Sequence, residues 1–177
     1  MQTLKTDHEE LAEILDELKV QLAKQDLPRA FETLDLFWAT LAVHIRAENI
    51  CLFPAVLNAP QSKFGVNNGM PDFEEVKAMV SSLRADHHLF MAELGQAMKE
   101  VRGLVVHPEN YSVPDVIADL KRRINRLGEL LHEHNETEEE LIYRWPPLIL
   151  DRESLKLLEL GVETEINNLP PRFARAS

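Results

Sequence analysis

The sequence predicts an all-α protein: an up-down-up-down four-helix bundle with an additional short C-terminal helix. Apolar residues recur every three or four positions over most of the chain, as on one face of a helix. Glycine and proline are scarce inside these periodic segments and β-branched runs are few, which favours helix over strand. The links between segments are short, and long helices with short links pack as antiparallel neighbours.

The first half of the chain supplies two of the predicted helices. Residues 4–25 form the first, and a capping-box motif at its start places its true beginning near Asp7. Residues 28–57 form the second. Pro54 lies inside this segment, so we expect the helix to kink there or to end early, because proline cannot donate the next backbone hydrogen bond.

The second half supplies the remaining helices. Residues 72–102 and 113–145 form the third and fourth, and two prolines at 146–147 end the fourth. An amphipathic segment at 152–166 follows. We expect it to pack across the end of the bundle that the short first helix leaves open, on the side of His8. The chain therefore divides into a bundle, residues 1–147, and a C-terminal helix and tail, residues 148–177, that packs on the same domain.

Composition limits the classes of partner. The 177 residues, 45% of them hydrophobic, suit one globular domain with a real core. A formal charge of −11 argues against nucleic-acid binding and against attraction to anionic membranes. The single cysteine, Cys51, excludes an internal disulfide. The apolar run Leu36–Val43 is too short to span a membrane, and the N-terminus is too polar for a secretory signal, so we expect a cytoplasmic protein.

Histidines mark the core-facing side of every predicted helix. Each of the four long helices carries one histidine in phase with its apolar residues. These are His8, His44, His87 and His134. The remaining histidines lie off these faces or in a loop; they are His88, His107 and His132.

Glutamates complete the pattern and reveal an internal repeat. The motif H-x-x-x-E occurs twice, and its members share a helix face. The two copies are His44 with Glu48 and His134 with Glu138. The segments TDHEEL and ADHHLF form a second, weaker pair, which selects His87 rather than His88 as the core histidine. The aspartates before His8 and His87 point off the apolar faces, so we expect a helix-start or solvent role for them.

The predicted helices place these side chains at similar heights. Measured from the shared turns, His8 is level with His44, and His44 with His87. His87 and His134 differ by about 7 Å at the helical rise, a gap that an uncertain helix end can absorb. Four imidazoles and two carboxylates therefore converge in one layer.

Burial of these groups calls for a counter-charge. An unpaired buried charge costs several kcal/mol, and no lysine or arginine lies on these faces. Metal ions would compensate, and carboxylates can bridge two of them. Nitrogen and oxygen ligands without thiolate suit iron, manganese or zinc. A single histidine on an apolar face is usually a hydrogen-bonded core residue, but one per helix, two with a glutamate four residues later, favours a two-metal site. Cys51 is best explained as a buried apolar residue.

These motifs resemble the hemerythrin-like family, also called the HHE cation-binding domain. The resemblance covers residues 4–145 and rests on DHEEL, HIRAENICLFP, ADHHLF and HNETEEELIY. It implies a four-helix bundle around two non-haem iron ions bridged by carboxylates and an oxo or hydroxo group, with manganese or zinc as substitutes. Carried across by position, the implied metal ligands are His8, His44, Glu48, His87, His134 and Glu138.

The chain departs from the oxygen-carrying hemerythrins at two positions. Those proteins have a second histidine four residues after the one in the third helix, where this chain has Met91, and an aspartate five residues after the last histidine, where Glu138 stands four after it. The set of four histidines and two glutamates is more similar to members that sense iron or oxygen, or that act in nitric-oxide stress and iron-centre repair.

Three functions follow from these observations. The first is a binding module for O2 or NO, or an iron sensor. The second is a diiron redox enzyme of the oxidase or peroxidase type, or an iron-centre repair protein. The third is a purely structural bundle with a vestigial site. An enzyme would need a proton donor near the metals, and the sequence names none. Oligomeric state is left open.

Overall fold

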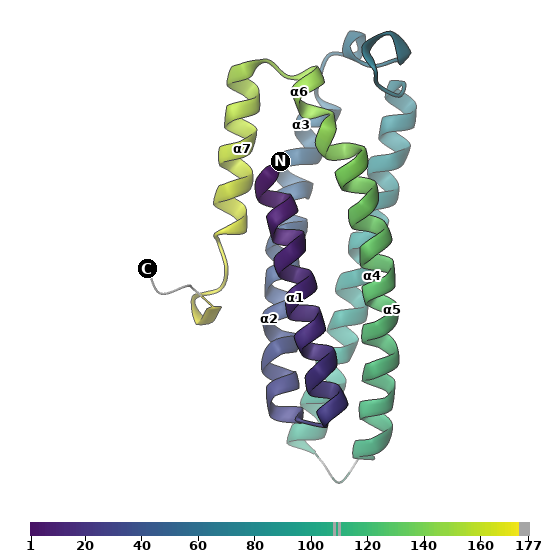
Figure 1. Ribbon diagram of the computed structural model, residues 1–177, viewed down its shortest axis with the longest axis vertical. Helices are drawn as coiled ribbons and strands as arrows, with labels where there is room; N and C mark the ends of the chain where they lie inside the picture. Colours follow the sequence, from purple (N-terminus) through teal and green to yellow (C-terminus); the bar gives the residue numbers. More distant parts are fainter. Residues whose placement is uncertain (108, 110, 174–177) are drawn as a thin grey trace.

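Four long helices lie lengthwise beside one another in the computed structural model, which describes residues 1–107, 109 and 111–173 (Figure 1). They alternate in direction, and no strand occurs among the described residues. The predicted all-α bundle is therefore confirmed. The four helices are α1 (Gln2–Lys24), α2 (Leu27–Ala47), α4 (Phe73–Val106) and α5 (Val113–Glu140).

Helix α1 begins earlier than predicted. It starts at Gln2 rather than near Asp7, because the extra turn buries Leu4 completely in the core. A capping box occurs instead at the start of α4. There the carboxylate of Asp72 accepts a hydrogen bond from the Glu75 N–H at 2.9 Å, and Glu75 accepts one from the Asp72 N–H at 3.0 Å.

The segment after α2 contains a π-helical turn, η1 (Glu48–Leu52), and a short helix, α3 (Phe53–Leu57). The Phe53 N–H bonds to the carbonyl of Glu48, five residues back. Pro54 explains this widening, since it has no N–H and its ring would clash with the carbonyl four residues earlier in a regular helix. The chain thus accommodates Pro54 with a π-turn, a feature that often accompanies functional sites.

Helix α5 ends at Glu140, earlier than the predicted residue 145. Leu141 leaves helical geometry with φ −118° and ψ −72°, and the short turns η5 (Ile142–Arg144) and α6 (Pro146–Ile149) follow. The prolines at 146 and 147 cannot donate the hydrogen bonds that a continued helix requires, so the chain tightens before them. Helix α4, by contrast, continues past residue 102 to Val106.

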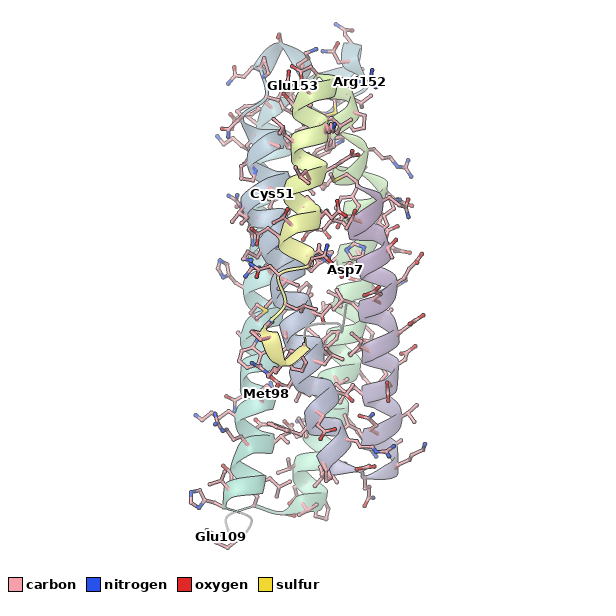
Figure 2. All side chains as sticks on the ribbon, turned by 90° about the vertical axis from the view of Figure 1, so that its left-hand side faces the viewer. Asp7, Cys51, Met98, Glu109, Arg152 and Glu153 are labelled. Atoms are coloured by element: carbon pink, nitrogen blue, oxygen red, sulfur yellow. The ribbon has the colours of Figure 1, made fainter. Side chains whose placement is uncertain are left out.

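Helix α7 (Arg152–Ile166) covers one side of the bundle. It lies lengthwise beside α2 and the start of α1, rather than crossing the end of the bundle as expected (Figure 1). An apolar face on a helix runs along its length, so α7 buries Leu158 and Val162 by lying lengthwise against its neighbours. Gly161 allows close approach, since a Cβ there would stand 3.3 Å from the sulfur of Cys51, which lies beside α7 in Figure 2.

The link from α3 to α4 contains two short 3-10 turns, η2 (Gln61–Lys63) and η3 (Val66–Asn68). Another 3-10 turn, η6 (Pro171–Phe173), ends the described chain. Within it, Arg172 bonds to Asp35 of α2 through two nitrogens, at 3.0 and 2.9 Å. These contacts hold the C-terminal segment against the bundle.

Two apolar clusters fill the interior, with a polar layer between them. The first, here the α7-side cluster, includes Leu4, Leu52, Val80, Ile142 and Leu158. The second, here the turn-side cluster, includes Leu11, Leu41, Leu94, Ile124 and Leu131. Each of the four long helical segments passes from one cluster to the other at the height of its core histidine.

Among the described residues, the stretch Leu27–Leu57 is long and apolar enough to cross a membrane by length and composition alone. The shorter run considered from the sequence, Leu36–Val43, is only part of it. In the bundle, 56% of its most apolar window is buried, and the stretch brings His44 and Glu48 into the protein interior. Burial in the core therefore accounts for its apolar character.

Candidate metal centre

The six side chains predicted to bind metal meet in the layer between the two apolar clusters. All six are buried, the two glutamates completely. The layer takes one histidine from each of α1, α2, α4 and α5, a glutamate from η1 and a glutamate from α5. These residues are His8, His44, Glu48, His87, His134 and Glu138. The height gap predicted between His87 and His134 is absent, because α4 is longer than predicted.

The histidines form two pairs that point the same ring nitrogen inward. The Nε2 atoms of His8 and His44 are 3.0 Å apart, and those of His87 and His134 are 3.1 Å apart. Within each pair, the two Nε2 atoms are therefore close enough to bind one cation together.

Both glutamates belong to both pairs. One group of donor atoms comes from His8, His44 and the two glutamates, and all of these atoms lie within 4.8 Å of one another. A second group, with the same limit, comes from His87, His134 and the same two glutamates. We call these groups the first position and the second position. Glu48 and Glu138 are shared between the positions, as bridging carboxylates are in two-metal centres.

Individual distances support this sharing. The Oε1 atom of Glu48 lies 3.5 Å from His44 Nε2, and its Oε2 atom lies 3.2 Å from His87 Nε2. Glu138 spans the layer in the same way, with Oε2 3.5 Å from His8 Nε2 and Oε1 3.1 Å from His134 Nε2. Each carboxylate therefore directs one oxygen at each histidine pair.

The protein alone leaves part of this layer unsatisfied. Glu48 Oε2 and Glu138 Oε1 are buried without a hydrogen-bond partner among the described residues. A buried carboxylate oxygen without a partner is costly, and a cation between the carboxylates and imidazoles would remove that cost. The donor set, four nitrogens and two carboxylates without sulfur, fits iron, manganese or zinc. The residues present therefore fit a pair of metal ions.

The electrostatics of the layer favour cations. Burial raises the pKa of Glu138, but the neighbouring imidazoles, His134 foremost, outweigh burial and hold it well below its usual range. Burial lowers the pKa of His44, but the charge of Glu48 and the hydrogen bond to Asp7 raise it to about 10. The same balance, with Glu138 and Glu48 as partners, raises the pKa of His87 to about 9. In the metal-free layer protons thus occupy the place of cations, and metal binding must displace them.

Outer carboxylates orient the first histidine pair. His44 donates its Nδ1–H to Asp7 at 2.7 Å, and His8 donates its Nδ1–H to Glu139 at 2.9 Å. A carboxylate can only accept here, so the Nδ1 hydrogen stays in place and Nε2 remains the nitrogen that faces the centre. Figure 2 shows Asp7 near the end of α7, about halfway along the bundle.

The second histidine pair has weaker outer partners. His134 faces Asp86 at 3.3 Å through Nδ1, and the Nδ1 of His87 lies 3.2 Å from the side-chain amide of Asn49. The oxygen of that amide accepts a hydrogen bond from Arg84 at 3.3 Å. The expectation of a helix-start or solvent role for the two aspartates is therefore wrong, because each reaches the histidine of the following long helix.

Tyr143 is the residue in this layer that sequence reasoning missed. Its hydroxyl donates to Glu48 Oε1 at 2.5 Å and lies 3.1 Å from His8 Nε2. Burial and the two glutamates raise its pKa well above the usual range. The repeat carried a signal for it, since Tyr143 stands five residues after Glu138 and Phe53 stands five residues after Glu48.

Other candidate residues lie away from the centre. His88 and His132 point to solvent, as their helical phase predicted, and His107 is exposed at the end of α4. Met91 occupies the position of the missing fifth histidine and packs against the turn-side cluster. Cys51 packs against the α7-side cluster and belongs to neither group of donor atoms.

Two cavities approach the layer from opposite sides. One, of about 200 Å³, lies between α4 and α5 and is lined by Asp86, Phe90 and His134 among others. The other, of about 740 Å³, lies between α1, α2 and the C-terminal segment and reaches Asp7. The small cavity touches a candidate ligand directly, whereas the large one reaches only an outer carboxylate.

Comparison with known proteins agrees with this geometry. The family model described as the hemerythrin HHE cation-binding domain matches residues 1–145, which include all six residues of the layer. Neither the curated proteins nor the solved structures that were searched gave a match. With its helical bundle and a buried histidine and glutamate cluster that can hold metal, the chain belongs to the hemerythrin HHE cation-binding family.

Proposed function

We propose that this protein binds two non-haem iron ions and uses them to bind or sense O2, NO or iron. One observation carries the proposal: two groups of donor atoms, each able to hold a metal ion, share Glu48 and Glu138. Two independent sites would not need common ligands. A shared pair of carboxylates is the arrangement that holds two cations close together and balances their charge.

The six residues of the layer would have two roles in metal binding. The four histidines would each bind through Nε2, and the two glutamates would bridge. When bound, the iron pair would supply a redox-active centre with coordination positions left open to a small diatomic ligand. The apolar clusters above and below exclude bulk water from the layer, and Phe53 and Phe90 stack or pack edge-on against the second histidine pair.

Metal analysis of protein purified without chelator tests the proposal. We expect two iron ions per chain, with a Mössbauer spectrum showing magnetic coupling between them. Manganese or zinc at the same stoichiometry would retain the two-metal site but change the metal. A single ion per chain, or none after reconstitution with Fe(II), would contradict the proposal.

A second candidate function, a diiron redox enzyme, is favoured by the cavity of about 200 Å³ that reaches His134. Such a cavity would bring a small oxidant as far as His134, at the edge of the second position. Single-turnover oxidation of the ferrous protein separates the two functions. A spectral change on addition of O2 that reverses on deoxygenation favours binding. Irreversible oxidation followed by repeated turnover with a reductant favours an enzyme.

A further inference from the structure

We propose that the phenolic oxygen of Tyr143 is a metal ligand at the first position, which would then have five protein donors while the second has four. The inference rests on the proposed two-iron function. The position of the Tyr143 oxygen among the candidate ligands supports it.

The oxygen of Tyr143 lies where a further ligand of a metal ion at the first position would lie. Metal–ligand bonds of about 2.1 Å place neighbouring ligands of one ion about 3 Å apart. The Tyr143 oxygen lies 3.1 Å from His8 Nε2, 2.5 Å from Glu48 Oε1 and 3.4 Å from Glu138 Oε2. Distances within the first position itself are similar: 3.0 Å between the two histidines and 3.5 Å between His44 and Glu48.

The break after α5 brings this oxygen into the layer, whereas a regular helix would not. In a continuous α-helix a residue five positions after Glu138 would be rotated by about 140° away from it. The break at Leu141 and the turn η5 return Tyr143 to the interior, where it is 3% exposed. The hydrogen-bond partners of its hydroxyl, His8, Glu48 and Glu138, are all candidate metal ligands.

The internal repeat separates the role of the ring from that of the hydroxyl. Phe53 holds the matching place in the other half, delivered there by the π-turn η1. Its ring stacks on His87 with centroids 5.7 Å apart, as the ring of Tyr143 stacks on His8 at 5.6 Å. An aromatic ring therefore serves packing in both halves. The hydroxyl exists in one half alone, so packing does not explain it.

The chemistry of binding balances without a change in oxidation state. On binding Fe(III), the phenol O–H bond breaks, the proton leaves to solvent, and the phenolate oxygen donates an electron pair to the ferric ion. A hard, anionic oxygen donor favours Fe(III) over softer cations. The first position would then have one protein donor more than the second, which would leave the second more open to a small ligand; the small cavity lies on that side, against His134.

The experiment uses the full chain loaded with Fe(III) and measures visible absorption and resonance Raman scattering. A ferric phenolate gives a visible charge-transfer band with enhanced tyrosinate vibrations. The chain has two tyrosines, so Tyr111→Phe is a matched control for Tyr143→Phe. We expect the band and vibrations in the unsubstituted protein and in Tyr111→Phe, and their loss in Tyr143→Phe.

The outcomes distinguish this inference from the proposed function. Two irons per chain without tyrosinate vibrations would overturn the role of Tyr143 and leave the two-iron function standing, as would a band that survives in Tyr143→Phe. Failure to bind two irons would overturn both. Because the vibrations are measured first in the unsubstituted protein, misfolding of the Tyr143→Phe protein cannot hide a negative result.

Discussion

The two halves of the candidate metal centre follow one plan and differ in a few residues. In each half an aspartate precedes the first histidine and reaches the second, as Asp7 reaches His44 and Asp86 reaches His134. In each half the residue after the shared glutamate contacts the first histidine of the other half. These residues are Asn49, which contacts His87, and Glu139, which contacts His8.

The differences between the two positions all give the first position more anionic or polar partners than the second. The first position has two outer carboxylates at 2.7 and 2.9 Å, whereas the second has an amide at 3.2 Å and a carboxylate at 3.3 Å that is 43% exposed. Tyr143 faces the first position, and Phe53 faces the second. A carboxylate on the outer nitrogen makes a histidine a more basic ligand. The repeat thus gives the two positions a common geometry. Single residue differences between its two copies make the first position more anionic and the second more open.

The strongest test of the shared plan is removal of a bridging charge. We expect Glu48→Gln and Glu138→Gln each to weaken both metals together, by more than about 100-fold in affinity, because each carboxylate serves both positions. Equilibrium dialysis with metal analysis gives the number of ions per chain. Loss of one ion with the other unaffected would show that the glutamates do not bridge.

Removal of a single histidine separates the halves. His87→Ala should deplete the second position sharply, and His8→Ala should deplete the first. The matched controls are His88→Ala and His132→Ala, whose side chains are exposed, and these should leave the metal content nearly unchanged. Equal losses from His87→Ala and His88→Ala would break the assignment by helical phase.

The histidine pKa values predict how stability depends on pH in each state. His44 and His87 hold protons in the metal-free fold up to about pH 10 and pH 9, against 6.5 for an ordinary histidine. Raised values stabilise the metal-free fold below pH 6.5, and this contribution is lost as pH rises toward 9 and 10. Metal affinity changes in the opposite sense, because fewer protons must be displaced. The gap in Tm between Zn(II)-loaded and chelator-treated protein should therefore widen from pH 6.5 to pH 9; a constant gap would contradict this.

The smallest expected effects on metal affinity come from substitution of the outer aspartates, Asp7 and Asp86. Their difference tests whether the two positions have unequal outer support. Asp7→Asn should reduce affinity at the first position by about 10- to 100-fold, since Asp7 is buried against His44. Asp86→Asn should have less effect, because its contact is longer and partly exposed to water. Competition with a chelator of known affinity measures both. A larger loss of metal affinity from Asp86→Asn than from Asp7→Asn would contradict the stronger outer support of the first position.

Helical phase was sufficient to identify the six residues of the layer. Side chains three and four apart share a face whatever the exact ends of the helix, so His44 with Glu48 and His134 with Glu138 could be placed before the structure was known. The bundle follows from the same periodicity, and the family from the resemblance of the histidine and glutamate motifs. That these six residues bind metal stays a prediction.

The residues around the layer could not be placed in the same way. Asp7 and Asp86 leave the apolar face of their own helices and contact histidines on neighbouring helices, which periodicity within one helix cannot show. Tyr143 could not be placed in the layer, because its position requires α5 to end at Glu140, five residues before the predicted end. Prolines cause the irregular turns beside both shared glutamates, and sequence reasoning recognised the prolines without predicting which residue each turn would bring inward.

The separation of the ligands along the chain has a consequence for biosynthesis. His8 pairs with Glu139 across 131 positions, and both candidate metal positions include Glu138. At roughly 5–20 residues per second, the ribosome would need on the order of ten seconds to add the last ligand after the first. A nascent chain that ends before Glu138 contains neither complete position. Neither metal could therefore be held in its final coordination until both halves of the bundle have been synthesised.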